Sequence, residues 1–96
     1  MNMEINPSEY KILIVDDVMS NVLLLKVLLT NEKFAIATAN NGRQALEQVD
    51  KEHPDLVLLD VMMPDLSGFE VAQRLKSNPD TADIPIIFLT ALNSTT

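Results

Sequence analysis

Two uninterrupted apolar runs, Leu56–Leu59 and Ile86–Leu89, constrain the fold of this chain more than any other feature. Neither run alternates with polar residues, and this pattern is typical of strands that are buried on both faces. Parallel strands covered by helices are buried in this way. Two further segments, Lys11–Val15 and Phe34–Ala39, also have the composition of strands. The sequence therefore predicts a buried parallel sheet.

Apolar residues at helical spacing lie between the predicted strands, and they indicate three helices over residues 20–31, 42–52 and 67–77. Either Ser20 or Asp17 could cap the start of the first helix. Ser67, with Glu70 three residues later, fits a capping box at the third. The order β-α-β-α-β-α-β with right-handed crossovers predicts an α/β fold, with helices on both faces of the sheet.

The totals of the chain exclude several classes of protein. Its 96 residues suffice for one small domain, and its net charge of −7 disfavours direct binding to the phosphates of nucleic acid. The apolar runs are too short to span a membrane, and the first residues lack the pattern of a signal peptide. The chain contains no cysteine, which fits a reducing cytoplasm.

Acidic residues follow two of the predicted strands: Asp16 and Asp17 follow the first, and Asp60 follows the third. Ligands of such sheets bind outside the carboxyl ends of the strands. If the two strands are neighbours, three carboxylates meet there and repel one another unless a cation offsets their charge. Mg²⁺ suits this oxygen-rich set, and an aspartate beside it can act as a nucleophile that forms an acyl phosphate. A plainer interpretation remains for Asp17, which could simply cap the following helix.

Other charged residues are weaker candidates for chemistry. His53, the only histidine, precedes the third strand and should lie at the opposite end of it from Asp60. Arg43 and Arg74 are expected to project into solvent from helix faces.

Four stretches, "ILIVDDVMSN", "ANNGRQAL", "HPDLVLLDVMMPDLSGFE" and "IPIIFLTA", together resemble the receiver domain of two-component response regulators. The resemblance covers residues 11–92. It implies a flavodoxin-like sheet of order 2-1-3-4-5. It also implies that a histidine kinase or phosphotransfer protein passes a phosphoryl group to an aspartate, so that the domain is a signalling relay and not an enzyme.

The resemblance also implies a role for individual residues. Asp60 would be the phosphoacceptor and a ligand of Mg²⁺. Asp17 would bind the ion directly, Asp16 would help through water or a hydrogen bond, and the backbone carbonyl of Met62 would complete the set. Thr90 would donate its hydroxyl to the phosphoryl oxygens.

The family pattern continues with a fifth strand, a lysine at its end and a fifth helix, and this sequence stops before them. We therefore expect residues 1–96 to form a single incomplete receiver domain with strand order 2-1-3-4. The fourth strand would then be an edge, and part of one sheet face would be uncovered. Such edges and faces favour pairing with another chain, so we expect self-association through them.

Two other functions stay open at this point. The fold could serve as an interaction or dimerisation module without phosphorylation, as the missing lysine would suggest. A Mg²⁺-dependent phosphohydrolase with an aspartyl nucleophile is less favoured, because such enzymes typically carry a second aspartate where this chain has Met62.

Overall fold

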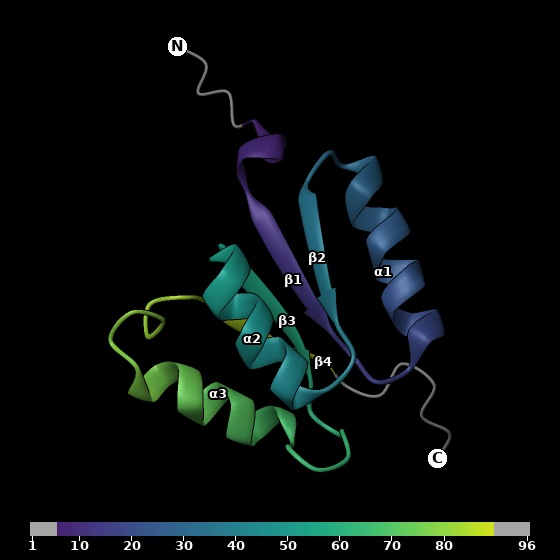
Figure 1. The fold of residues 1–96 in the computed structure, drawn as a ribbon. Coiled ribbons are helices and arrows are strands. Elements are labelled where there is room, and N and C mark those ends of the chain that lie inside the picture. Colours follow the sequence, from purple (N-terminus) through teal and green to yellow (C-terminus); the bar gives the residue numbers. More distant parts are fainter. Residues whose placement is uncertain (1–5, 90–96) are drawn as a thin grey trace.

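The computed structural model describes residues 6–89. Its four strands form one parallel sheet in the order β2-β1-β3-β4 (Figure 1). The strands are β1 (Lys11–Val15), β2 (Ala35–Ala39), β3 (Leu56–Asp60) and β4 (Ile86–Leu89). The predicted strand order is confirmed, and the boundaries differ from the prediction only in that β2 begins one residue later and β3 includes Asp60.

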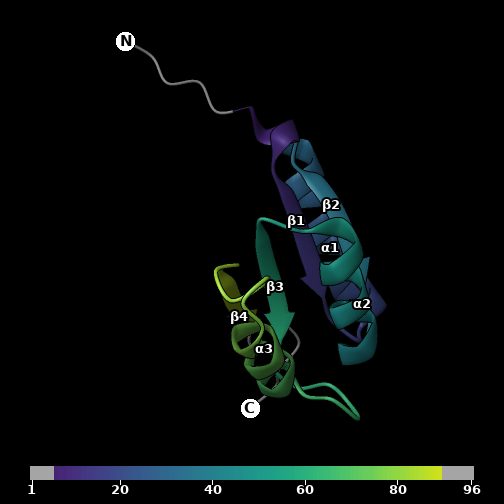
Figure 2. The same cartoon turned by 60° about the vertical axis from the view of Figure 1, so that its left-hand side comes forward.

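Three helices connect the strands and cover both faces of the sheet (Figures 1 and 2). α1 lies on one face, and α2 and α3 lie on the other, as the two separate cores of the molecule also show. A short 3₁₀ helix precedes β1. The bounds are η1 (Pro7–Glu9), α1 (Met19–Asn31), α2 (Gly42–Glu52) and α3 (Gly68–Ser77). This is the flavodoxin-like α/β architecture that the sequence predicted.

The alternation of side chains along the buried strands separates the two cores. Leu13, Val57 and Leu59 point toward α2 and α3, whereas Ile14 and Leu58 point toward α1. Because successive strand residues face opposite sides of a sheet, strands with helices on both faces must be apolar throughout. The central strands β1 and β3 follow this rule over Ile12–Val15 and Leu56–Leu59. The exceptions stand at the strand ends: the half-buried Lys11 begins β1, and the buried Asp60 ends β3.

Helix caps show one correct prediction and one error. At α3, the Ser67 hydroxyl accepts a hydrogen bond from the Glu70 backbone N–H at 3.2 Å, and the Glu70 carboxylate accepts one from Ser67, which confirms the capping box. At α1, the predicted caps were wrong. Val18 occupies the N-cap position without a side-chain hydrogen bond, and Ser20 lies inside the helix.

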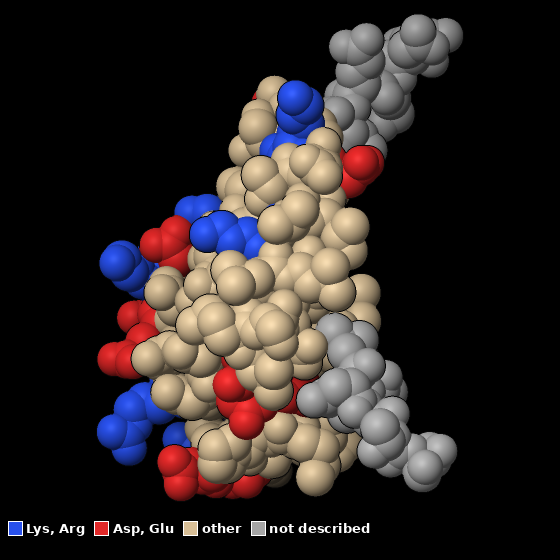
Figure 3. Space-filling model, turned by 90° about the vertical axis from the view of Figure 1, so that its right-hand side faces the viewer, with Lys and Arg blue, Asp and Glu red and all other residues tan. Residues whose placement is uncertain are grey.

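α1 is apolar on its outer face as well as on the face against the sheet. Five large apolar residues of this helix are more than half exposed: Met19, Leu23, Leu24, Val27 and Leu28. Figure 3 shows the broad uncharged surface over this part of the molecule. Within residues 6–89, none of the helices combines the length and the apolar character that a bilayer crossing requires.

Candidate metal centre

The register between the two central strands places two aspartates side by side. β1 and β3 run parallel, and Val15 pairs with Leu59. Asp16 and Asp60 are the next residues along these two strands, so both stand at the same carboxyl edge of the sheet. Asp17 follows directly. The sequence prediction that the ends of the first and third strands meet is therefore correct.

The three carboxylates lie close enough to share one ion. One carboxylate oxygen from each of Asp16, Asp17 and Asp60 lies within 4.8 Å of the others. Asp16 and Asp60 are buried, and Asp17 is exposed. Carboxylate oxygens are hard ligands, and Mg²⁺ is commonly held by one or two of them together with water. The donor set and its partial exposure thus fit a hydrated Mg²⁺.

Asp16 has hydrogen bonds that fix its position. Its Oδ1 accepts from the backbone N–H of Val18 at 2.9 Å, and its Oδ2 accepts from the side-chain amide of Asn21 at 3.1 Å. Asn21 belongs to the first turn of α1, so this contact ties the acidic loop to the helix. The sequence alone does not indicate a role for Asn21, because only the fold shows that the first turn of α1 lies against Asp16.

Asp60 is held less firmly and in a less favourable environment. Its Oδ1 accepts one hydrogen bond, from the backbone N–H of Met62 at 3.1 Å. Burial at the end of an apolar strand raises the pKa of Asp60 to about 6, and the negative charges of Asp16 and Asp17 act in the same direction, while the Met62 N–H opposes them. A nearby divalent cation would remove this electrostatic penalty.

The loop between β3 and α3 is packed tightly against the end of β3. The backbone N–H of Gly68 donates to the carbonyl of Val61 at 3.0 Å. A Cβ at Gly68 would overlap the carbonyl oxygen of Asp60 and the Val61 backbone. Gly68 therefore allows α3 to begin directly beside the carboxyl end of β3.

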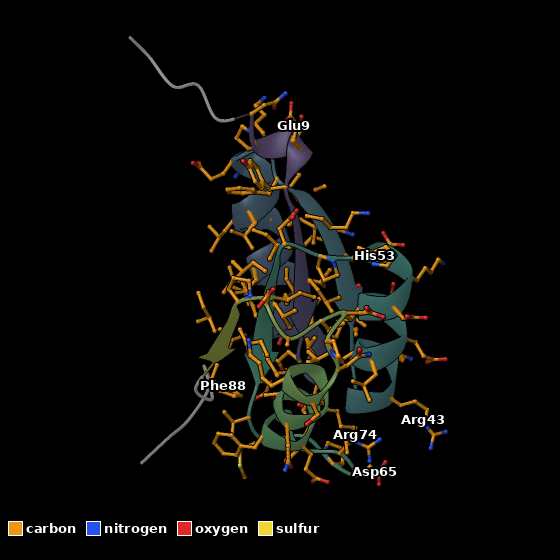
Figure 4. The ribbon with its side chains drawn as sticks, turned by 90° about the vertical axis from the view of Figure 1, so that its left-hand side faces the viewer. Glu9, Arg43, His53, Asp65, Arg74 and Phe88 are labelled. Atoms are coloured by element: carbon orange, nitrogen blue, oxygen red, sulfur yellow. The ribbon has the colours of Figure 1, made fainter. Side chains whose placement is uncertain are left out.

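Three other residues named from the sequence are Thr90, Met62 and His53. Thr90 lies outside the described residues. The side chain of Met62 is exposed, and the role of its backbone carbonyl stays a prediction. His53 (labelled in Figure 4) is the C-cap residue of α2 and precedes β3. Asp60 is the last residue of β3, so the two residues lie at opposite ends of this strand, as predicted.

A parallel sheet with helices on both faces and an acidic cluster at the carboxyl ends of its central strands defines a doubly wound α/β protein whose site suits a divalent cation. Residues 12–96 match the family model described as "Response regulator receiver domain". The chain belongs to this family.

Relatives and solved structures agree with this assignment. The chain is 46% identical over 83 residues to "Response regulator PleD" of Caulobacter vibrioides, covering 86% of this chain and 18% of that protein. It is 48% identical over 90 residues to "Probable transcriptional regulator ycf27" of Cyanophora paradoxa, covering 94% of this chain and 36% of that protein. It thus spans only a minor part of either relative.

Among solved structures, the N-terminal domain of a response regulator receiver protein from Methanoculleus marisnigri matches with a TM-score of 0.84 and 41% identity, over 90% of this chain and 70% of that chain. The chemotaxis response regulator CheY4 of Vibrio cholerae matches with a TM-score of 0.81 and 32% identity, over 88% and 71%. The fold and the membership of the receiver family are therefore established, and the chain is a receiver domain of response regulators.

Proposed function

We propose that Asp60 is the residue of this receiver domain that accepts a phosphoryl group, and that the donor is a phosphohistidine of a histidine kinase or a phosphotransfer protein. One observation carries the proposal: the buried carboxylate of Asp60 stands at the end of β3 with an oxygen within 4.8 Å of oxygens from Asp16 and Asp17. The membership of the family supports the same role.

Asp60 is suited to act as a nucleophile at neutral pH. With a pKa of about 6 the carboxylate is mostly ionised there, yet it is more basic than an ordinary aspartate. The Met62 N–H holds Oδ1, which leaves the other oxygen for attack on phosphorus. A bond forms between this oxygen and phosphorus, and the bond between phosphorus and the histidine nitrogen breaks. The electron pair remains on the imidazole, and the product is an acyl phosphate on Asp60.

We assign the metal ligands to the same cluster. Asp17 and Asp60 would bind Mg²⁺ directly, Asp16 would act through water or a hydrogen bond, and the backbone carbonyl of Met62 would be a further ligand. When bound, the ion offsets the charge of the carboxylates and of the transferred phosphoryl group. Thr90 would donate its hydroxyl to the phosphoryl oxygens.

The wider role follows from this chemistry. We propose residues 1–96 as a single receiver domain that works as a cytoplasmic relay and not as an enzyme. Phosphorylation would shift the balance between two existing conformations. The acidic net charge of −7 argues against direct contact with nucleic acid. In the curated relatives, activities such as transcriptional regulation are properties of proteins much longer than this chain.

We further propose that the 96-residue polypeptide associates with itself through β4. In the described part of the chain, β4 is the last strand of the sheet, and Ile87 and Phe88 are 51% and 41% exposed. An apolar edge strand offers unpaired backbone groups to a second strand. The exposed apolar surface of α1 adds to the surface that a second chain could cover.

Phosphorylation with a small acyl phosphate and Mg²⁺, followed by intact-mass spectrometry, tests the main proposal. We expect the mass of one phosphoryl group to be added to the wild-type chain and to Asp65→Asn, an exposed control in the same loop. Asp60→Asn should remain unmodified. Equal modification of Asp60→Asn would show that another residue is the acceptor, and no modification of the folded wild type would favour an interaction module instead.

A further inference from the structure

A second site lies away from the acidic cluster, between the start of α2, the loop after β3 and the middle of α3. Here a pocket of about 480 Å³ is lined by two arginines, Arg43 of α2 and Arg74 of α3, together with Leu46, Leu66 and Asp65. Figure 4 shows Arg43, Arg74 and Asp65 at the same corner of the molecule. This volume lies in the range of pockets that bind small molecules.

Among residues 6–89, no protein group pairs with either of the two guanidinium groups, and both arginines are exposed. Within residues 6–89, the side chains of Arg43 and Arg74 make no hydrogen bond. The one ion pair in these residues joins Lys11 to Glu52, and neither of them lines the pocket. Asp65 lines the same pocket but forms no ion pair with either arginine. The chain as a whole carries a net charge of −7, whereas two positively charged side chains line this one pocket.

The chemistry of these groups indicates an anionic ligand. The planar guanidinium binds phosphate and carboxylate through paired hydrogen bonds, and two of them can hold one dianion from two sides. α2 begins at Gly42, and the positive end of this eleven-residue helix adds to the same potential. Leu46 and Leu66 supply an apolar wall, and Asp65 can accept a hydrogen bond from a hydroxyl or amino group.

We propose that this pocket binds a phosphomonoester of a polar small molecule, such as a sugar phosphate or a mononucleotide. Arg43 and Arg74 hold the phosphate, and Asp65 faces a donor group on the body of the ligand. Because Asp65 and Leu66 belong to the loop that follows Asp60, an occupant of the pocket contacts the segment between the acidic cluster and α3. This binding does not depend on whether Asp60 accepts a phosphoryl group.

Titrations followed by NMR amide shifts can test the proposal on the ¹⁵N-labelled chain. Adenosine monophosphate, inorganic phosphate and adenosine are added separately, with a chelator present so that no cation at the acidic cluster holds the anion. We expect saturable shifts at the amides of Gly42, Arg43, Leu66 and Arg74 with adenosine monophosphate, weaker binding of inorganic phosphate and no binding of adenosine. Absence of shifts at these amides, or equal binding of adenosine, would overturn the proposal.

Variants of exposed residues then separate a specific site from general attraction of anions. Arg43→Gln and Arg74→Gln should each weaken binding about tenfold or more, because each removes charged hydrogen bonds. Lys51→Gln makes the same change of charge on α2 outside the pocket and should have little effect. Asp65→Asn removes a repelling charge and should strengthen binding, and asparagine tolerates the positive φ of 67° at this position. Equal weakening by Lys51→Gln and the arginine variants would contradict the proposal.

Discussion

Asp60 is an ionisable group at the end of an apolar strand, and its environment opposes its charge. The buried position and the neighbouring Asp16 and Asp17 raise its pKa to about 6, against 3.8 for an ordinary aspartate. Folding must therefore bring a carboxylate into a place where its ionised form is unfavourable. The same burial and neighbouring negative charges make the Asp60 carboxylate more basic and would favour a cation beside it.

The raised pKa predicts a specific effect of Asp60→Asn on stability. The folded protein binds the proton of Asp60 more tightly than the unfolded chain does, so ionisation lowers the free energy of unfolding as pH rises from about 4 to above 6. Without Mg²⁺ at pH 8, Asp60→Asn should therefore raise the free energy of unfolding by about 1–3 kcal/mol. Near pH 4 the gain should largely disappear, because the wild-type group is then protonated in the folded state.

Denaturant unfolding at the two pH values, with a chelator present, measures this difference. Asp65→Asn is a matched control, since this exposed carboxylate lies in the same loop outside the acidic cluster. A gain for Asp60→Asn that is the same at both pH values would show that ionisation of Asp60 is not its cause.

At the scale of single elements, the start of α3 depends on a glycine. Alanine normally stabilises a helix relative to glycine by up to about 1 kcal/mol. At Gly68 the opposite is expected, because the new Cβ would overlap the Asp60 carbonyl and the backbone must shift. We predict that Gly68→Ala lowers the free energy of unfolding by at least about 1–3 kcal/mol, the range of overpacked sites. Thermal or denaturant unfolding measures this, and a variant as stable as the wild type would refute the close packing of the loop.

Serine substitutions test the helix caps. Ser67→Ala removes the capping hydrogen bond that the Ser67 hydroxyl accepts from the Glu70 backbone N–H, and it should lower the free energy of unfolding by about 1 kcal/mol. Ser20 was a candidate cap from the sequence but lies inside α1, so Ser20→Ala should be neutral or slightly stabilising. Denaturant unfolding of the two variants compares them directly. A larger loss from Ser20→Ala than from Ser67→Ala would reverse the assignment of the caps.

The elements show what the sequence could predict and why the rest needed the fold. Buried strands are visible as apolar runs, and an aspartate directly after such a run stands at the carboxyl end of its strand. The resemblance to receiver domains implied that the first and third strands are neighbours, and with that strand order Asp16 and Asp60 could be paired in advance. The N-cap of α1 could not be predicted, because Val18 occupies it without a side-chain hydrogen bond. The nearby Asp16 carboxylate instead accepts hydrogen bonds from the Val18 backbone N–H and the Asn21 side-chain amide. The shared pocket of Arg43 and Arg74 was also missed, since it depends on how α2 packs against α3.

At the scale of the whole molecule, apolar surface remains on β4 and on the outer face of α1. Five large apolar side chains of α1 and two of β4 are exposed, and burial of such side chains favours association. We predict that the 96-residue polypeptide forms dimers or larger species at high concentration, and that Ile87→Lys shifts it toward monomer by placing a charge on the edge strand.

Size-exclusion chromatography with light scattering measures the molar mass of these species. Tyr10→Lys adds the same charge at an exposed residue before β1 and should leave the distribution unchanged. A wild-type chain that stays monomeric at every concentration would exclude association through β4.

Binding of Mg²⁺ tests most directly whether the ends of β1 and β3 form one site. Isothermal titration at pH 7.5 should show one ion per chain for the wild type, and Asp17→Asn or Asp60→Asn should each weaken its binding about tenfold or more, because each removes a charged ligand. Asp65→Asn should leave the affinity unchanged within about twofold, since exposed and distant charges are screened. Unchanged affinity in both Asp17→Asn and Asp60→Asn would show that these carboxylates do not share an ion, and the proposed role of the cluster would be wrong.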